Sequence, residues 1–175
     1  MRQNPQMTTN KISTRVLAAG FLISCFWISA DPSVMPFPKD YLKWTLVKSS
    51  PVGPNAPAFS AQPCVAPCTG AVHHFYANEK AVEGYRVGKF PDGAVIVDDL
   101  METRAAGGSS TDGPRRSVSV MAKNSQLYSE TGGWGFESFK GENQSDGARA
   151  DAKAACHACH SKQKDRDFVY SELRK

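Results

Sequence analysis

The alternation of polar and apolar positions predicts three strands in the middle of the chain. Residues 117–123, "SVSVMAK", alternate polar and apolar side chains, which is the two-residue period of a half-buried strand. Residues 94–103, "AVIVDDLMET", begin with β-branched apolar side chains and predict a buried strand. Aromatic and small residues alternate in residues 71–78, "AVHHFYAN", so we expect a strand there as well.

Two helices are predicted from capping residues and from the residue that ends one of them. Asn78 can cap a helix over "EKAVEGYRV" that ends at Gly88. Ser145 or Asp146 can cap a second helix, over "GARADAKAACHACHSK". Between the helices, "FPDG" predicts a turn and residues 105–116, "AAGGSSTDGPRR", predict a loop, because glycine and proline favour turns.

Other segments show less regular patterns. Prolines interrupt residues 31–72, where only "YLKWTLVKS" is predicted to be ordered, as a short helix or the start of a strand. In "TGGWGFESF", residues 131–139, the glycines predict a bend that carries Trp134 and Phe136. Their large flat rings stand where the backbone can approach a bound group closely, so both are candidate cofactor-binding residues.

The composition is that of one globular domain. The chain has 175 residues, of which 41% are hydrophobic and 22% are charged, which argues against wholesale disorder and against two full domains. The net charge of +4 includes Arg2, Lys11 and Arg15, and no acid precedes Asp31. The +1 that remains gives no electrostatic basis for binding nucleic acid.

The first thirty residues have the pattern of an export signal. Three cations precede the apolar run "VLAAGFLISCFWISA", as in a secretory signal peptide, and this run is shorter than the roughly 20 residues of a membrane-spanning helix. We predict a signal peptide over residues 1–30 and a single domain over residues 31–175. Acylation of Cys25 would instead give a lipoprotein, and an uncleaved anchor or a buried helix is a third interpretation. Either cleavage sends the domain to the bacterial periplasm, an oxidising compartment.

Cys64 and Cys68 lie in the proline-rich segment with three residues between them. In an exported protein we expect them to form a local disulfide, and the alternative is a metal site. A redox dithiol would have two residues between its cysteines.

The segment "ACHACHSK" contains C-x-x-C-H, the attachment signature of a c-type haem. Positions i and i+3 share a face of a helix, so Cys156 and Cys159 can both form thioethers with the haem vinyl groups. His160 is then the ligand of the iron. Attachment of this kind requires export, which the predicted signal peptide supplies.

Two other kinds of site explain the same residues less well. A zinc knuckle needs a second ligand pair, and the spacing and proline context of Cys64 and Cys68 fit that role poorly. A thioredoxin-like C-x-x-C opens a helix after a strand, whereas this motif comes late in a predicted helix. His157, between the cysteines, is either a bystander or a residue at the haem edge.

The other face of the iron must be formed by upstream residues, because "SKQKDRDFVYSELRK" after His160 contains neither Met nor His. We expect either a sixth ligand from upstream or a five-coordinate iron that is open to a small molecule. His74 is a candidate haem-binding residue, and for His73 and His74 the alternative is a surface position. The candidate sixth ligands are Met101, Met121, His73 and His74.

The order of these motifs resembles the cytochrome P460 family. The similarity runs through "YLKWTLVKS", "HHFYANEKAVEGYRVGKFPDGAVIVDDL", "VMAKNSQLYSETGGWGFESF" and "ACHACHSKQKDRDFVYS", and covers nearly all of residues 36–172. The resemblance implies an α+β fold, with a mainly antiparallel β-sheet, a few packed helices and the haem-attachment motif on the C-terminal helix. It also implies one covalently attached haem c with its iron, and a homodimer.

The family includes enzymes that oxidise hydroxylamine and cytochrome c′-beta relatives that bind nitric oxide or carbon monoxide. The first expected function is therefore a periplasmic mono-haem cytochrome with an open iron face that binds or oxidises hydroxylamine or nitric oxide, served by a redox partner protein. The second is a non-enzymatic cytochrome of the c′-beta type, which transfers electrons or binds a gas.

The chain departs from the family's enzymes at one point. Those enzymes carry a lysine cross-linked to the porphyrin, which we would expect near the strand after the F/W-P-D-G turn, but "AVIVDDLMETR" contains no lysine. Asp98, Asp99 and Glu102 stand there instead. An acid near the haem can accept a proton from a bound N–H or O–H group, so Asp98 and Glu102 are the candidate catalytic residues. The alternative is that both face solvent on an edge strand.

Overall fold

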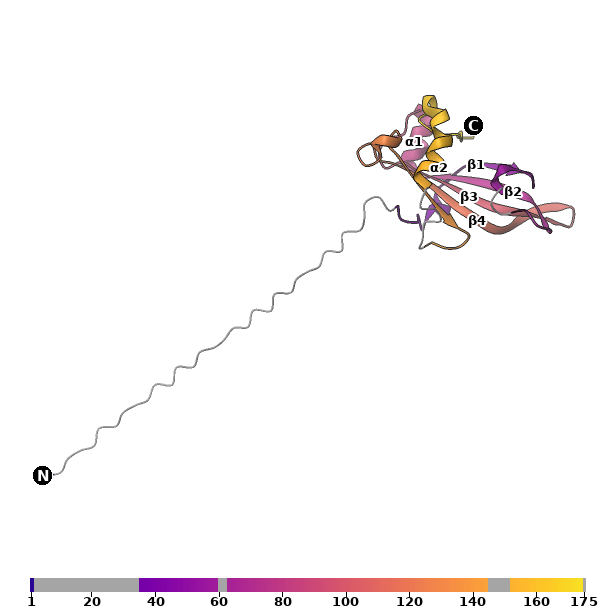
Figure 1. Ribbon diagram of the computed structural model, residues 1–175, viewed down its shortest axis with the longest axis horizontal. Coiled ribbons are helices and arrows are strands. Elements are labelled where there is room, and N and C mark those ends of the chain that lie inside the picture. The colour runs from indigo at the N-terminus through magenta and orange to yellow at the C-terminus, as the bar shows by residue number, and fades with distance from the viewer. Residues whose placement is uncertain (2–34, 60–62, 145–151, 175) are drawn as a thin grey trace. The chain divides into compact units, whose positions relative to one another are not determined.

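The computed structural model describes residues 35–59, 63–144 and 152–174, together with Met1. Its centre is one antiparallel sheet of five strands, which pair in chain order from β1 to β5 (Figure 1). The elements are η1 (Tyr41–Lys43), β1 (Thr45–Val52), η2 (Pro57–Phe59), β2 (Cys68–Ala77), α1 (Glu79–Val87), β3 (Val95–Ala106), β4 (Ser109–Lys123), η3 (Ser129–Thr131), β5 (Trp134–Lys140), α2 (Ala152–His160) and η4 (Ser161–Arg166), where η marks a 3₁₀ helix. The α+β class with a mainly antiparallel sheet is confirmed.

The helix α1 has the ends that its capping residues predict. The side-chain oxygen of Asn78 accepts hydrogen bonds from the N–H groups of Ala81 (2.9 Å) and Val95 (3.0 Å), which joins the start of the helix to the start of β3. Gly88 adopts a left-handed conformation (φ 79°) that ends the helix. Ala81 and Val82 are buried in the core beside the sheet, so the cap also fixes where α1 packs.

The loop predicted for residues 105–116 was wrong. These residues extend β3 and β4 into a long hairpin, and its turn is limited to Gly107 and Gly108, both with positive φ. Pairs such as Ala105 with Ser110 continue the ladder of the two strands. Pairing with a neighbouring strand therefore outweighs the local preference of glycine and proline for loops.

The bend predicted for residues 131–139 is confined to its first residues. Gly132 and Gly133 have positive φ, and Trp134 and Phe136 lie on the strand β5 that follows. The ring of Phe168 packs against Gly132, where a Cβ would clash with it. The bend thus leaves room for the chain segment that returns from α2.

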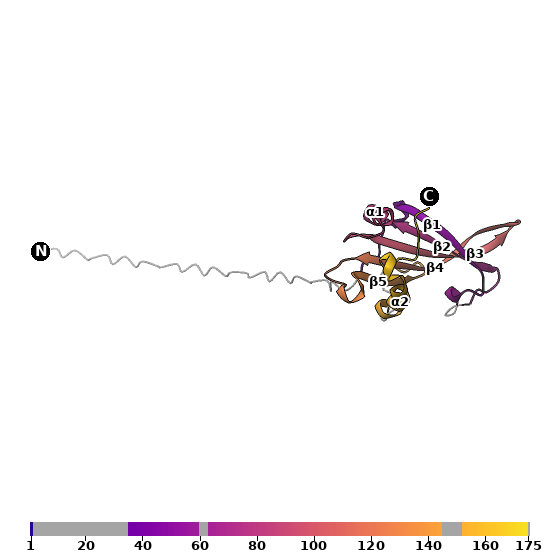
Figure 2. The same ribbon diagram turned by 90° about the horizontal axis from the view of Figure 1, so that it is seen from above.

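The sheet carries a hydrophobic core on each face. On one face Val97, Val118 and Phe139 pack with Met35 and Tyr41 from the N-terminal segment. The other face holds the larger cluster, which includes Ile96, Met121, Trp134, Phe136 and Val169 together with the apolar side of α1. Helix α2 packs against β5, as Figure 2 shows. Residues near the C-terminus therefore complete the second core.

A smaller cluster lies around the predicted disulfide. Cys64 and Cys68 are joined, which confirms that pairing, and both pack against a cluster that contains Phe59. The guanidinium of Arg116 lies 4.5 Å from the centre of the Phe59 ring and donates to the Glu102 carboxylate at 2.8 Å. Glu102 is thus the partner of a buried arginine.

Several predictions lie outside the described residues. They are the signal peptide over residues 1–30, acylation at Cys25, and the helix caps Ser145 and Asp146. In the part of the chain that is described, α2 starts at Ala152. No helix within that part is both long enough and apolar enough to span a membrane.

Candidate functional site

Helix α2 ends at His160, and the chain then returns through η4 so that later residues pack around the His160 ring. Phe136 from β5 contacts that ring at a centroid distance of 5.2 Å, and Tyr170 meets it edge-on at 5.3 Å. The Tyr170 hydroxyl donates to the carbonyl of Cys159 at 2.9 Å. The imidazole is therefore held between aromatic rings that come from different elements.

Of the two ring nitrogens of His160, Nδ1 has a hydrogen-bond partner among the described residues. Nδ1 lies 2.7 Å from the carbonyl oxygen of Phe168, and because a carbonyl oxygen can only accept, Nδ1 carries the proton. Burial lowers the pKa of His160 below its ordinary value of 6.5, which favours the neutral ring. A neutral imidazole with its proton on Nδ1 presents the lone pair of Nε2, the form that binds a metal.

The carbonyl of Phe168 is fixed by the residue before it. Asp167 and Phe168 have positive φ (49° and 67°), which gives a tight turn after η4. The Asp167 carboxylate accepts from Lys123 at 2.6 Å, and its backbone carbonyl accepts from the Trp134 indole at 2.8 Å. The side chains of Lys123 and Asp167 are only 9% and 15% exposed. The orientation of His160 therefore depends on a buried ion pair and an indole.

The two cysteines of α2 lie next to this histidine. Cys156 and Cys159 lie on α2, and their spacing of three places both on one side of the helix. Cys156 lines a pocket together with His160, whereas Cys159 is exposed. The thiols and the Nε2 lone pair thus gather at the end of one helix.

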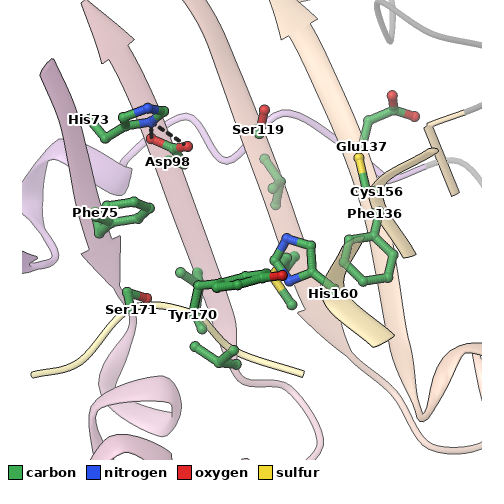
Figure 3. Close-up of a pocket in the computed structure, with 14 residues that line it drawn as sticks. His73, Phe75, Asp98, Ser119, Phe136, Glu137, Cys156, His160, Tyr170 and Ser171 are labelled. Atoms are coloured by element: carbon green, nitrogen blue, oxygen red, sulfur yellow. Dashed lines mark hydrogen bonds and ion pairs between the residues drawn. The ribbon is translucent and has the colours of Figure 1, made fainter. Parts of the chain in front are cut away.

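The pocket lies between α2, the sheet and the C-terminal segment. Figure 3 places Phe75, His73 and Asp98 on one side of it and His160, Phe136 and Cys156 on the other. Aromatic and aliphatic side chains make up much of its wall. The lining residues are His73, Phe75, Ile96, Asp98, Ser119, Val120, Met121, Phe136, Glu137, Cys156, His160, Val169, Tyr170 and Ser171.

His73 and Asp98 form a pair in this wall. They come from the neighbouring strands β2 and β3, and Nδ1 of His73 lies 2.9 Å from each carboxylate oxygen of Asp98. Both side chains are about three-quarters buried, with 24% and 26% exposed. The hydrogen bond to Asp98 raises the pKa of His73 above 6.5, although burial acts the other way. The pair and Glu137 are therefore the acidic and basic groups that line this largely apolar wall beside His160.

The structure brings four of the predicted site residues together. Asp98, Phe136, Cys156 and His160 all line the pocket, and Cys159 lies one helical turn along from Cys156 on α2.

Other predicted residues are not among the lining residues. Trp134 is fully buried behind the returning segment, and Glu102 pairs with Arg116. His74 has its Nδ1 2.9 Å from the Ser49 hydroxyl. Its Nε2 lies 3.7 Å from an Asp112 oxygen, too far for a hydrogen bond. Among the candidate sixth ligands, His73 and Met121 line the pocket, whereas Met101 and His74 do not.

The site predicted from the sequence does not include the returning segment, residues 165–171, which follows the haem motif. Asp167, Phe168 and Tyr170 all act on the histidine or its helix, yet only the short sequence "DRDFVYS" after the motif indicates them. Its two aromatic residues, Phe168 and Tyr170, follow the motif so closely that they can fold back onto it. This short spacing could have predicted from the sequence that they contact the motif.

These residues fit a covalently bound haem. Two thiols on one side of a helix suit thioether formation, a neutral histidine suits iron, and apolar walls suit a porphyrin. The second cysteine pair that a zinc knuckle would need, Cys64 and Cys68, is joined in a disulfide. Within the described ranges, no cluster of three or more His, Cys, Asp or Glu side chains could hold another metal ion.

Comparison with known proteins agrees with this chemistry. The family model described as Cytochrome P460 matches residues 38–171, which is most of the chain. No curated protein matches the chain. The matched region runs from before the first strand to the end of the segment that returns over His160.

Proposed function

The chain belongs to the cytochrome P460 family, whose members are cytochromes with haem c and iron, and we propose that it is an exported mono-haem cytochrome that binds or oxidises a small nitrogen species. The observation that carries the proposal is the pocket between His160 and the His73–Asp98 pair. The apolar walls suit the porphyrin, and the His73–Asp98 pair adds a titratable group that electron transfer alone does not require. Hydroxylamine is small and carries N–H and O–H groups that can hydrogen-bond to an acid–base pair, and nitric oxide is small and nearly apolar, which suits an apolar wall.

The residues at the end of α2 have assigned roles in this proposal. Cys156 and Cys159 would form the two thioethers, and Nε2 of His160 would bind the iron. The haem supplies ligand binding at the iron and the exchange of electrons. Phe136 and Tyr170 hold the His160 ring in one orientation, because both contact it.

The residues of the pocket wall would exclude water and exchange a proton with a bound ligand. Phe75, Ile96 and Phe136 keep water away from a bound ligand, which strengthens its interactions with polar groups. His73 and Asp98 supply a group that can take up or release a proton as a ligand N–H or O–H bond changes. This is the role expected of Asp98 from the sequence. Glu102 stays a weaker candidate, since its carboxylate is paired with Arg116.

A second candidate function is a non-enzymatic cytochrome of the c′-beta type that binds a gas or transfers electrons. The specific observation in its favour is that no lysine is among the described residues that line the pocket. We therefore propose that the haem is held by two thioethers alone, without the lysine cross-link of the family's enzymes.

The test uses protein produced with its leader in a bacterium that matures c-type cytochromes. We expect ordinary c-type absorption bands, a mass for the haem peptide that corresponds to two thioethers, and new spectra with carbon monoxide and nitric oxide. Oxidation of hydroxylamine with an artificial electron acceptor would support the first function, and gas binding without that reaction would support the second. A six-coordinate spectrum that none of these ligands changes would contradict the first function and the gas-binding form of the second, and would favour a cytochrome that only transfers electrons.

The proposal also includes location and partners. The leader over residues 1–30 supports export to the periplasm, with a lipid anchor at Cys25 as the alternative. Oxidation of a substrate requires a redox partner protein that removes the electrons. We further propose a homodimer, which sedimentation of the haem-loaded protein would test.

A further inference from the structure

The His73–Asp98 pair has one engaged end and one available end. A carboxylate accepts hydrogen bonds, so the contacts of 2.9 Å from Nδ1 to both oxygens of Asp98 place the proton on Nδ1. Nε2 of His73 has no hydrogen-bond partner within the described part of the chain. The ring also stacks on Phe75, at 5.8 Å with an interplanar angle of 7°. The hydrogen bond and the ring contact therefore fix its orientation.

We propose that His73 is the proton acceptor of the pocket and that Asp98 is a positioning residue that acts through it. The inference rests on the proposed function, because it assumes that a ligand binds between His73 and His160. It differs from the expectation that Asp98 takes the proton directly. Both oxygens of Asp98 face Nδ1 of His73, so the lone pair that is available to a ligand is the one on Nε2.

The step itself moves only a proton. The lone pair of Nε2 takes the proton from an O–H or N–H group of the ligand, and the electron pair of the broken bond stays on the ligand. The imidazolium that forms carries a positive charge next to the Asp98 carboxylate, which stabilises it. The same contact raises the pKa of His73, which makes it a stronger base than an isolated histidine.

The other titratable groups around His73 are engaged elsewhere. The Glu137 carboxylate on β5 accepts from a backbone N–H, the Tyr170 hydroxyl donates to a backbone carbonyl, and His160 is the assigned iron ligand. Glu102 and Arg116, on β3 and β4, pair with each other at 2.8 Å. His74, the neighbour of His73 on β2, is not among the lining residues.

Cyanide binding to the ferric haem tests the inference without a turnover assay. Hydrogen cyanide must lose its proton when it binds ferric haem, so a base in the pocket accelerates association, which stopped-flow absorption measures. We expect the rate of the parent protein to rise with pH through the pKa of His73. His73→Gln should be slower by roughly 100-fold and lack this inflection. In Asp98→Asn the inflection should move to lower pH, because the contact that raises the pKa is lost.

Two controls keep the result interpretable. Carbon monoxide binds the ferrous haem without proton transfer, so the parent and His73→Gln should bind it at similar rates if the pocket is intact. Asp112→Asn removes a carboxylate that lies 3.7 Å from the neighbouring His74 and outside the pocket lining, and it should bind cyanide at the parental rate.

Three outcomes would overturn the inference in different ways. Cyanide binding by His73→Gln with the parental rate and pH profile would remove His73 as the base and leave the proposed function standing. A six-coordinate parental spectrum that becomes five-coordinate in His73→Gln would make His73 an iron ligand. Failure of the parent and of every variant to bind either ligand would contradict the proposed function as well.

Discussion

Burial and three neighbouring residues determine the protonation and the orientation of the His160 ring. The Phe168 carbonyl fixes the proton on Nδ1, burial keeps the ring neutral, and the rings of Phe136 and Tyr170 limit its rotation. The C-x-x-C-H motif alone predicts that this residue binds iron. It does not predict the carbonyl that selects the tautomer, because that contact depends on how the chain returns after η4. The sequence therefore predicts the iron ligand but not the environment of its ring.

Replacing the two cysteines of α2 tests each of the two predicted thioether bonds to the haem separately. We expect Cys156→Ser and Cys159→Ser each to keep one thioether, and the double variant to release its haem under denaturing conditions, because no sulfur remains at the motif. Mass spectrometry of the denatured proteins measures this directly. Replacing Cys64 and Cys68 by serine, which removes only the disulfide, should leave the haem-bound mass otherwise unchanged. A double variant that retains covalent haem would refute the assignment.

The His73–Asp98 pair also gives a prediction for the pH dependence of the stability of the fold. Because its folded-state pKa is raised above 6.5 by Asp98, His73 stabilises the fold fully below about pH 6.5 and loses this contribution as the pH rises through the raised value. The unfolding free energy of the parent should therefore fall, relative to that of His73→Gln, over this window. Urea denaturation of both haem-loaded proteins at a series of pH values measures the difference. Parallel pH profiles would show that the ion pair adds nothing to stability.

At the scale of elements, local signals predict some segments well and others poorly. α1 is bounded by Asn78 and Gly88, whose capping roles depend only on nearby backbone groups, so its limits could be predicted. The far end of the β3–β4 hairpin could not be predicted, because it is polar and rich in glycine, and its two strands are ordered by pairing with each other. Trp134 lies on β5 rather than on a bend for the same reason.

The turn between η4 and the C-terminal segment depends on one buried ion pair. Lys123→Met or Asp167→Asn leaves the other charge without its partner in a site that is at most 15% exposed. Each change should lower the unfolding free energy by about 3 kcal/mol. Lys153→Met is the matched control, because Lys153 and its partner Glu130 are 57% and 81% exposed, and it should cost less than about 1 kcal/mol. Urea denaturation gives all three values, and equal costs for the buried and exposed pairs would contradict this role.

At the scale of the whole molecule, the pocket joins residues that are far apart in the sequence. His73 and Asp98 meet because β2 pairs with β3 in a register that sets Phe75 opposite Asp98. Cys156 and His160 reach the same pocket because α2 packs on β5, the strand at the opposite edge of the sheet from β1. Each residue could be selected from the sequence as a candidate. Their meeting could not, since it follows from strand order and register rather than from any local pattern.

The predicted leader and the haem motif together give a prediction about where the haem is attached. Thioethers of c-type cytochromes form outside the cytoplasm, so a variant that starts at Asp31 should accumulate as colourless protein. Its four cysteines should all react with an alkylating agent, because the Cys64–Cys68 disulfide also needs an oxidising compartment. Fusion of the same residues 31–175 to an unrelated secretory signal should restore the covalent haem. Cys25→Ser separates the two processing routes, because it abolishes acylation and leaves cleavage after Ala30 possible. Covalent haem on the leaderless protein would show that attachment does not require export, and would contradict the argument for a periplasmic location.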